Sequence, residues 1–242
     1  MSQEKSFIRI FQYSETSILL EWKAEPKLDL LNELVLFKSL LNSNLSGIKQ
    51  ITLSYKSLLL QFSNPLKIYK NIKDEILKLY SSFDSSKKTI KSKHWNIPIC
   101  YESKYASDLS VLLEHLKLSH HQLIKLHTKP IYQIYFIGFL PGFLYLEGLD
   151  TKLYHPRKES PELKVSKGAV GIGGRQTGIY PNQSPGGWNI IGTSPTSMFD
   201  PDLKQPCFAK SGDTLSFYSI SDTTFKKIRK NKIPPNFKEL IL

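Results

Sequence analysis

Two arginines lie within the most unusual stretch of this 242-residue chain, residues 138–192. Only four of the 33 lysine and arginine residues are Arg, and both Arg157 and Arg175 fall in this stretch. The planar guanidinium fork of Arg matches a carboxylate or a phosphate in a way that the Lys ammonium group does not. We therefore predict that Arg157 and Arg175 bind an anion. The alternative is a structural ion pair or a clamp on backbone carbonyls.

The sequence GIGGRQTG, residues 171–178, surrounds Arg175. A phosphate-binding loop of the Walker type needs a following Lys-Ser/Thr pair and a helix, and a dinucleotide loop needs a strand and a helix around it. Here the chain continues as IYPNQSPGGW, which is not a helical sequence. A hairpin whose backbone N–H groups form an anion-binding nest stays open, with Gln176 and Thr177 beside Arg175. A turn that needs positive φ accounts better for the glycines themselves.

The histidines give no metal motif. His115, His120 and His121 lack the i, i+4 spacing of a helical zinc pair, so no metal site is predicted. His127 lies shortly before the stretch 138–192 and His155 lies within it, so these two histidines are the better candidates for site residues. We expect His127 to be part of the anion site.

The two cysteines, Cys100 and Cys207, show neither a disulfide framework nor a partnered nucleophile, and no G-x-S-x-G motif occurs. Catalytic residues therefore stay unassigned. The residues after Met1 are polar and contain no apolar leader, and no apolar run is long enough to span a bilayer. We expect a cytoplasmic protein that contacts no membrane.

The formal net charge of +12 comes mainly from scattered lysines. Binding to nucleic acid requires a coherent basic stripe or a known module, and neither is present. A lysine-rich solvated surface is the favoured interpretation, and an acidic protein partner remains an alternative.

Large aromatic residues alternate with Gly and Pro throughout residues 138–192, which a flexible linker would not show. This pattern predicts short strands joined by tight turns, as in a small barrel. The residues expected to build it are Gly138, Phe139, Pro141, Gly142, Phe143, Tyr180, Pro185, Gly186, Gly187 and Trp188. Phe139, Phe143 and Trp188 are expected in the core, together with Tyr145.

The first third of the chain predicts two hairpins and two helices in the order ββαββα. Residues 6–22 and 48–62 alternate as strand pairs, and residues 28–41 have helical spacing. Asn64 and Pro65 are expected to cap and open a second helix, which carries Ile68, Ile72, Ile76, Leu79 and Phe83 on one face. Two helices against one sheet form a small α+β domain.

The polar segment 81–93 marks the expected boundary, which divides the chain into domains 1–88 and 89–242. In the second domain we expect a strand at 97–101 and short helices at 108–116 and 119–126, capped by Ser107 or Asp108 and by Ser119. Strands and turns follow from residue 131 to 219. The basic tail has no assigned place.

These motifs closely resemble a carboxyltransferase-domain family that contains the 5-oxoprolinase B subunit, the KipI-type histidine-kinase inhibitor and allophanate hydrolase subunit 1. The resemblance lies between residues 101 and 200. It is carried by His127-Thr128, Gly138-Phe139, Pro141-Gly142-Phe143, Pro156-Arg157, Gln176 to Pro181 and Pro185 to Trp188.

The resemblance implies a ferredoxin-like N-terminal domain and an all-β cyclophilin-like barrel. It implies an ATP-dependent complex that opens 5-oxoproline to glutamate. In that complex a C subunit, similar to allophanate hydrolase subunit 2, completes a composite site, and an A subunit is the third member. ATP belongs to the complex, and no biotin or metal is implied for this chain. The resemblance also leaves open a KipI-type protein that binds a sensor histidine kinase, or a component of an allophanate hydrolase or urea carboxylase complex.

The chain departs from the family pattern at two positions where the family often has Arg. Glu162 follows Pro161, and Thr193 follows Ile191-Gly192. Both changes remove positive charge from the implied anion site. Either the substrate is held differently, or the chain has a non-catalytic role.

Overall fold

The computed structural model describes residues 8–25, 28–66, 68–84 and 91–241. Contacts between Cα atoms divide the chain into two compact units, residues 1–90 (the N-terminal unit) and residues 91–241 (the C-terminal unit). The boundary predicted between residues 88 and 89 falls outside the described residues and stays a prediction.

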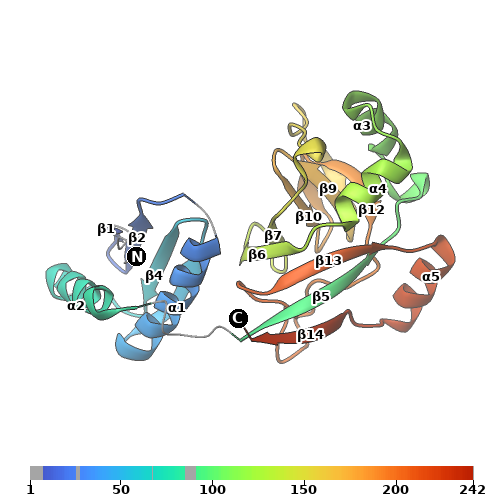
Figure 1. Cartoon of the computed structure of the whole chain (residues 1–242). Coiled ribbons are helices and arrows are strands. Elements are labelled where there is room, and N and C mark those ends of the chain that lie inside the picture. The colour runs from blue at the N-terminus through green and yellow to red at the C-terminus, as the bar shows by residue number, and fades with distance from the viewer. Residues whose placement is uncertain (1–7, 26–27, 67, 85–90, 242) are drawn as a thin grey trace. The chain divides into compact units, whose positions relative to one another are not determined.

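The N-terminal unit confirms the predicted order ββαββα. Its elements are β1 (Ile8–Ser14), β2 (Ser17–Trp22), α1 (Leu28–Asn44), β3 (Ile48–Leu53), β4 (Ser57–Phe62) and α2 (Tyr69–Ser82). The strands form one antiparallel sheet in the order β1-β2-β4-β3. Trp22 of β2, Phe37 of α1 and Tyr80 of α2 meet edge to face at centroid distances of 5.1–6.0 Å. These rings join the helices to the sheet, and both helices are labelled in Figure 1.

The predicted start of the second helix is wrong. Helix α2 begins at Tyr69, and its N-cap Ile68 provides no side-chain hydrogen bond. The Leu66 N–H instead donates to the Glu15 carbonyl at 2.8 Å, so the chain after β4 stays attached to the β1–β2 turn. Of the predicted apolar face, Ile76 and Phe83 are buried, whereas Ile68 is 57% exposed.

The C-terminal unit contains a five-stranded sheet in the order β14-β5-β13-β6-β7. These strands are β5 (Lys91–Ile99), β6 (Tyr132–Ile137), β7 (Leu144–Glu147), β13 (Thr214–Ser219) and β14 (Asn236–Ile241). Strands β5 and β13 run parallel, and β14 lies antiparallel to β5 (Figure 1). The tail that could not be placed from the sequence is therefore an edge strand.

Two smaller sheets complete the strands of this unit. One has the order β10-β9-β12 and the other pairs β11 with β8. Their strands are β8 (Glu162–Val165), β9 (Ala169–Gly173), β10 (Gln176–Ile179), β11 (Ser184–Gly186) and β12 (Asn189–Thr193). The predicted closed barrel is not seen in the described part of the chain.

The C-terminal unit also contains helices, so the expected all-β class is wrong for it. They are α3 (Leu109–Leu116), α4 (His120–Thr128) and α5 (Asp222–Asn231), with 3-10 turns at Ser103–Tyr105 and Thr151–Leu153. The predicted Ser119 cap of α4 is confirmed, because Ser119 and Gln122 form a reciprocal capping box. Helix α5 was not predicted. The architecture is a mixed α/β fold with several sheets.

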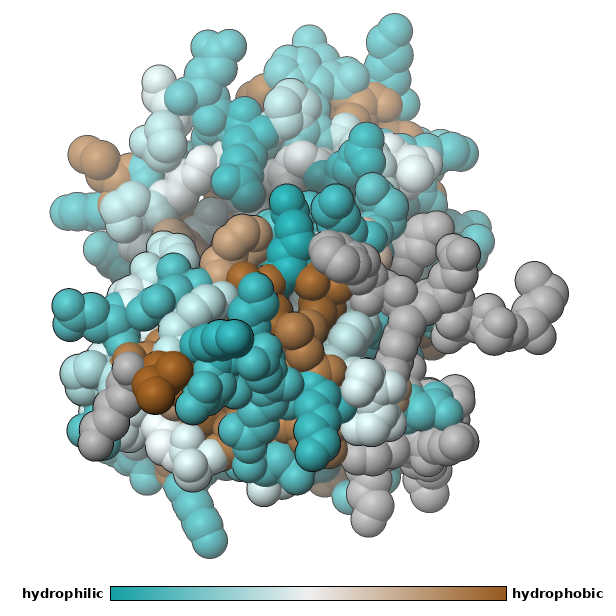
Figure 2. All heavy atoms as spheres, turned by 90° about the vertical axis from the view of Figure 1, so that its left-hand side faces the viewer, coloured by the Kyte–Doolittle hydropathy of each residue, from teal (hydrophilic) through white to brown (hydrophobic). Residues whose placement is uncertain are grey.

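The surface agrees with the lysine-rich composition. On the face shown in Figure 2, hydrophilic side chains predominate and hydrophobic ones gather in small patches. Within the described residues, every helix is too short or too polar to cross a lipid bilayer.

Candidate functional site

Arg175 stands at the tip of the β9–β10 hairpin. Gly173 pairs with Gln176, so Gly174 and Arg175 form a two-residue loop. Gly174 has a φ of +67°, and Arg175 has a negative φ, which is the pattern of a type II′ turn. A Cβ atom at residue 174 would meet no atom within 4 Å, so backbone conformation alone requires this glycine. The turn holds Arg175 exposed to solvent.

The other glycines of the hairpin make room for Trp188. A Cβ atom at Gly173 would lie 2.3 Å from the indole Cδ1 atom, and one at Gly178 would lie 3.1 Å from Cζ3. Trp188 is 5% exposed and packs edge to face on Phe143 and Tyr180. The glycine pattern therefore follows from packing against an aromatic ring and does not require an anion-binding nest.

The two arginines rest on different aromatic rings. Arg157 is exposed, with its guanidinium carbon 5.8 Å from the Trp188 ring centroid. The guanidinium carbon of Arg175 lies 5.9 Å from the Tyr154 ring. Both residues flank one backbone bridge, in which His155 and Gly174 exchange hydrogen bonds of 3.1 and 2.7 Å. The structure thus places both arginines around one turn, each over its own ring. We call this surface, Arg157, Arg175 and Gln176 with Tyr154 and Trp188, the arginine face.

Thr177 follows Gln176 on β10, and both Thr177 and its hydrogen-bond partner His127 are fully buried. The His127 Nδ1 atom lies 2.7 Å from the Tyr101 hydroxyl, and its Nε2 atom lies 2.9 Å from the Thr177 hydroxyl. Thr177 in turn donates to the Gly171 carbonyl at 3.0 Å. Burial lowers the pKa of His127 to about 3, so the imidazole is neutral at physiological pH. Its place is the hydrogen-bonded interior, where it supports the hairpin and does not reach solvent.

Phe139 differs from the core position expected for it. It is 62% exposed and has a φ of +65°, which is unusual for a residue with a Cβ atom. The Leu140 N–H donates to the Gly138 carbonyl at 2.8 Å across this residue, forming a strained three-residue turn. Phe143, by contrast, is buried and packs edge to face on Phe139. The turn therefore presents an aromatic ring to solvent.

The remaining motif residues shape the backbone around the aromatic cluster. Gly142 has a φ of +86°, and a Cβ atom at Gly186 would lie 2.3 Å from the Tyr180 hydroxyl. Gly187 accepts a hydrogen bond from the Lys158 N–H at 2.7 Å. Pro141 and Pro185 are exposed at the surface of these turns.

The two positions that depart from the family pattern have structural partners. Glu162 forms an ion pair with Lys158, which also contacts Asp108 at 2.7 Å. Burial alone would lower the pKa of Lys158, but the bonds to Asp108 and Glu162 raise it above the ordinary value. Thr193 donates from its hydroxyl to the Tyr105 carbonyl at 2.8 Å. Both side chains therefore fix neighbouring loops.

A cavity of about 690 Å³ lies elsewhere in the C-terminal unit. Its walls include Lys167, Thr196 and Lys232, and neither Arg157 nor Arg175 contributes to it. This cavity leaves no signal in the sequence, because its residues form no motif and one wall comes from helix α5, which the sequence does not predict. No cluster of three or more His, Cys, Asp or Glu residues suited to a metal ion occurs in the described ranges.

The hairpin, its indole-packed glycines and the mixed α/β architecture define a class of protein. Residues 8–209 match the family model described as carboxyltransferase domain, subdomain C and D. The chain belongs to this family.

Its relatives within the family carry a specific name, the B subunit of 5-oxoprolinase. The chain is 32% identical over 172 residues to this protein from Bacillus subtilis, covering 71% of this chain and 70% of that protein. It is 42% identical over 127 residues to the protein of the same name from Haemophilus influenzae, covering 52% of this chain and 60% of that protein.

A solved structure shares the fold. The crystal structure of TTHA0988 superimposes with a TM-score of 0.73 at 28% identity, over 89% of this chain and 40% of that chain. The chain therefore spans well under half of that solved protein and about 60% to 70% of these two B-subunit relatives.

Proposed function

We propose that this chain is the B subunit of an ATP-dependent 5-oxoprolinase, which converts 5-oxoproline to L-glutamate together with partner subunits. The observation that carries the proposal is the similarity to proteins named as the B subunit of 5-oxoprolinase, at 32–42% identity. The segment that matches the family model includes the β9–β10 hairpin and both arginines.

The arginine face is the proposed contribution of this chain to a site shared with the C subunit. Arg157 and Arg175 are exposed, and the aromatic ring under each one limits the positions its guanidinium fork can take. The carboxylate of 5-oxoproline is the group that such a fork binds in two parallel hydrogen bonds. Gln176 is half-buried beside Arg175 and offers an amide to the lactam ring.

The hydrogen-bonded core around His127 supplies rigidity. His127 and Thr177 connect the hairpin to Tyr101 and fix the strand from which Gln176 projects. A site held by a rigid sheet loses little conformational entropy on binding. In this proposal His127 positions the hairpin and does not touch the substrate.

ATP is used by the assembled complex, and the chain alone is inactive because its site is incomplete. The partners are the C subunit and, as a third component, the A subunit, and the protein acts in the cytoplasm. We also infer that the N-terminal unit is ferredoxin-like and that the C-terminal unit is related to cyclophilin-like domains, with its strands in several sheets.

Reconstitution tests the proposal. The purified chain is assayed for ATP-dependent release of glutamate from 5-oxoproline, first alone and then with both partner subunits. We expect turnover only in the complete mixture. Turnover by the chain alone would contradict the shared site, and an inactive complete mixture in which the three chains co-purify would overturn the assigned activity.

A further inference from the structure

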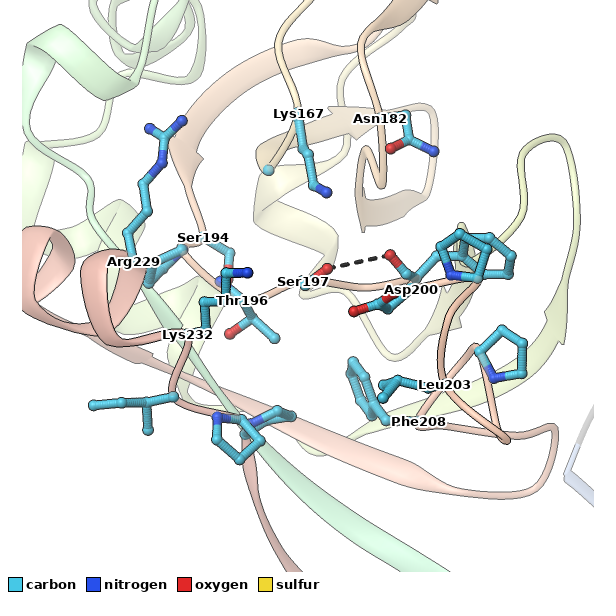
Figure 3. A pocket seen from close by; sticks show the side chains of 18 of the residues that line it. Lys167, Asn182, Ser194, Thr196, Ser197, Asp200, Leu203, Phe208, Arg229 and Lys232 are labelled. Atoms are coloured by element: carbon cyan, nitrogen blue, oxygen red, sulfur yellow. Dashed lines mark hydrogen bonds between the residues drawn. The ribbon is translucent and has the colours of Figure 1, made fainter.

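The 690 Å³ cavity of the C-terminal unit is separate from the arginine face. It lies between the segment 194–208, which follows β12, and the end of α5 with the loop after it (Figure 3). Its volume is in the range of 300–1,000 Å³ that small-molecule sites occupy. Its second wall, residues 225–235, lies beyond residue 209, where the family match ends.

Positive charge predominates among the polar groups of this cavity. Lys167 and Lys232 contribute two cations, against one carboxylate from Asp200, and Arg229 lines the cavity with its guanidinium turned away from the hollow (Figure 3). Lys167 and Lys232 extend toward the hollow from different segments of the chain (Figure 3). A small cavity with excess positive charge favours an anionic occupant.

The floor of the cavity is rigid. Gly168 has a φ of +85°, and a Cβ atom there would lie 2.4 Å from the Ser194 carbonyl oxygen. The Ser194 N–H donates to the Gly168 carbonyl at 2.8 Å, so this close approach is fixed by a hydrogen bond. Only glycine fits at residue 168, and Lys167 is thereby held at the rim.

Thr196 carries an unused polar group at this floor. The residue is 4% exposed, and its hydroxyl has no hydrogen-bond partner among the residues that the structure describes. A buried hydroxyl without a partner destabilises the fold, and a ligand acceptor would remove that cost. This is a second observation, independent of charge, that points to a ligand.

The opposite side of the cavity is apolar. Phe199, Leu203 and Phe208 line it together with several prolines, and Leu203 is 57% exposed. The Asp200 N–H donates to the Pro206 carbonyl at 2.9 Å, which closes this loop on itself. An occupant therefore needs an apolar body as well as a charge.

We propose that this cavity binds a small organic anion with a flat apolar body. Its charged group contacts Lys167 and Lys232 and accepts a hydrogen bond from Thr196, and its body packs on Phe199, Leu203 and Phe208. The charged group is a phosphate or a carboxylate, and both fit the same donors. The proposal does not depend on the 5-oxoprolinase assignment.

Calorimetric titration of the purified chain distinguishes these ligand types. The probes are ATP with its neutral counterpart adenosine, and 2-naphthoate with its neutral counterpart 2-naphthol. We expect at least one anion to bind at least about tenfold more tightly than its neutral counterpart, as expected for a charge-assisted contact. Binding of ATP alone indicates an organic phosphate, and binding of 2-naphthoate alone indicates an organic carboxylate.

Variants locate the binding. Lys167→Gln and Lys232→Gln should each raise the Kd of the bound anion about tenfold, and Thr196→Val should raise it severalfold. Lys227→Gln is the matched control, because Lys227 lies on α5 and is not part of the cavity wall. Saturable binding by neither anion below about 1 mM overturns the proposal. Equal weakening by Lys227→Gln also overturns it, because attraction to the positive chain as a whole would then explain the binding.

Discussion

His127 shows how the interior sets the chemistry of a single residue. Its two ring nitrogens contact the hydroxyls of Tyr101 and Thr177, and its ring stacks on Phe217 at 4.7 Å with an interplanar angle of 4°. A histidine in this setting remains neutral because no water reaches it. Its motif position is explained by packing and hydrogen bonding.

The pKa of His127 predicts how stability depends on pH. The unfolded chain binds a proton on this residue below the ordinary pKa of 6.5, whereas the folded chain does so only near 3. The stabilising contribution is therefore complete above pH 6.5 and is lost as pH falls toward 3, at about 1.4 kcal/mol per pH unit. Urea unfolding between pH 7.5 and 4.5 measures this slope. In the His127→Gln variant the slope should be smaller, and an unchanged slope would show that His127 is not its source.

Arg175 is exposed to solvent, whereas His127 is fully buried. In the proposed 5-oxoprolinase complex, Arg175→Ala should lower kcat/KM about tenfold or more, because a charge-assisted contact contributes about 1.5–3 kcal/mol. The free energy of unfolding should change by less than about 0.5 kcal/mol, as for other exposed substitutions. Arg175→Lys is the matched control, which keeps the charge but removes the fork. A large loss of stability in Arg175→Ala would make the residue structural.

At the scale of elements, strand β9 depends on the Trp188 indole. Replacing Trp188 by Ala should destabilise the protein by roughly 3–5 kcal/mol, because the ring is buried between the hairpin and Phe143. Chemical unfolding at equilibrium measures the change. A negligible shift would mean that the ring does not contribute to the core.

Adjacent glycines of the hairpin allow a sharper test. Gly173→Ala should cost about 1–3 kcal/mol through overlap with the indole. That cost should nearly vanish in a Trp188→Ala background, since the two residues are in contact. Gly174→Ala should cost about the same in both backgrounds. Its cost comes from the φ of +67°, since a Cβ atom at this residue would meet no neighbouring atom. Identical behaviour of the two glycines would refute this assignment.

Local patterns predicted some elements well and others poorly. The strand pairs 8–22 and 48–62 and the Ser119 cap follow from alternation and capping over a few residues. The Asn64-Pro65 signal predicts the start of helix α2 too early, because the hydrogen bond from Leu66 to Glu15 overrides it. Strand β14 was missed, because an edge strand is defined by its partner β5 and not by its own sequence.

At the scale of the whole molecule, the chain consists of two compact units. Each has its own buried core, which is the condition for folding independently. A protein of residues 91–242 should therefore fold alone, with a dispersed NMR spectrum that overlays on part of the full-length spectrum. A collapsed spectrum would show that this unit requires the first 90 residues.

The sequence alone determined the family, the element order of the first unit and the prominence of Arg157 and Arg175, because these follow from motifs, short periodicities and residue chemistry. The tertiary structure decided what the motif glycines and His127 do, since Gly173 meets Trp188 and His127 meets Thr177 only after distant strands pair. It also revealed the cavity, whose walls come from residues 167–208 and 225–235. Contacts of such long range leave no local pattern, so only the folded chain brings them together.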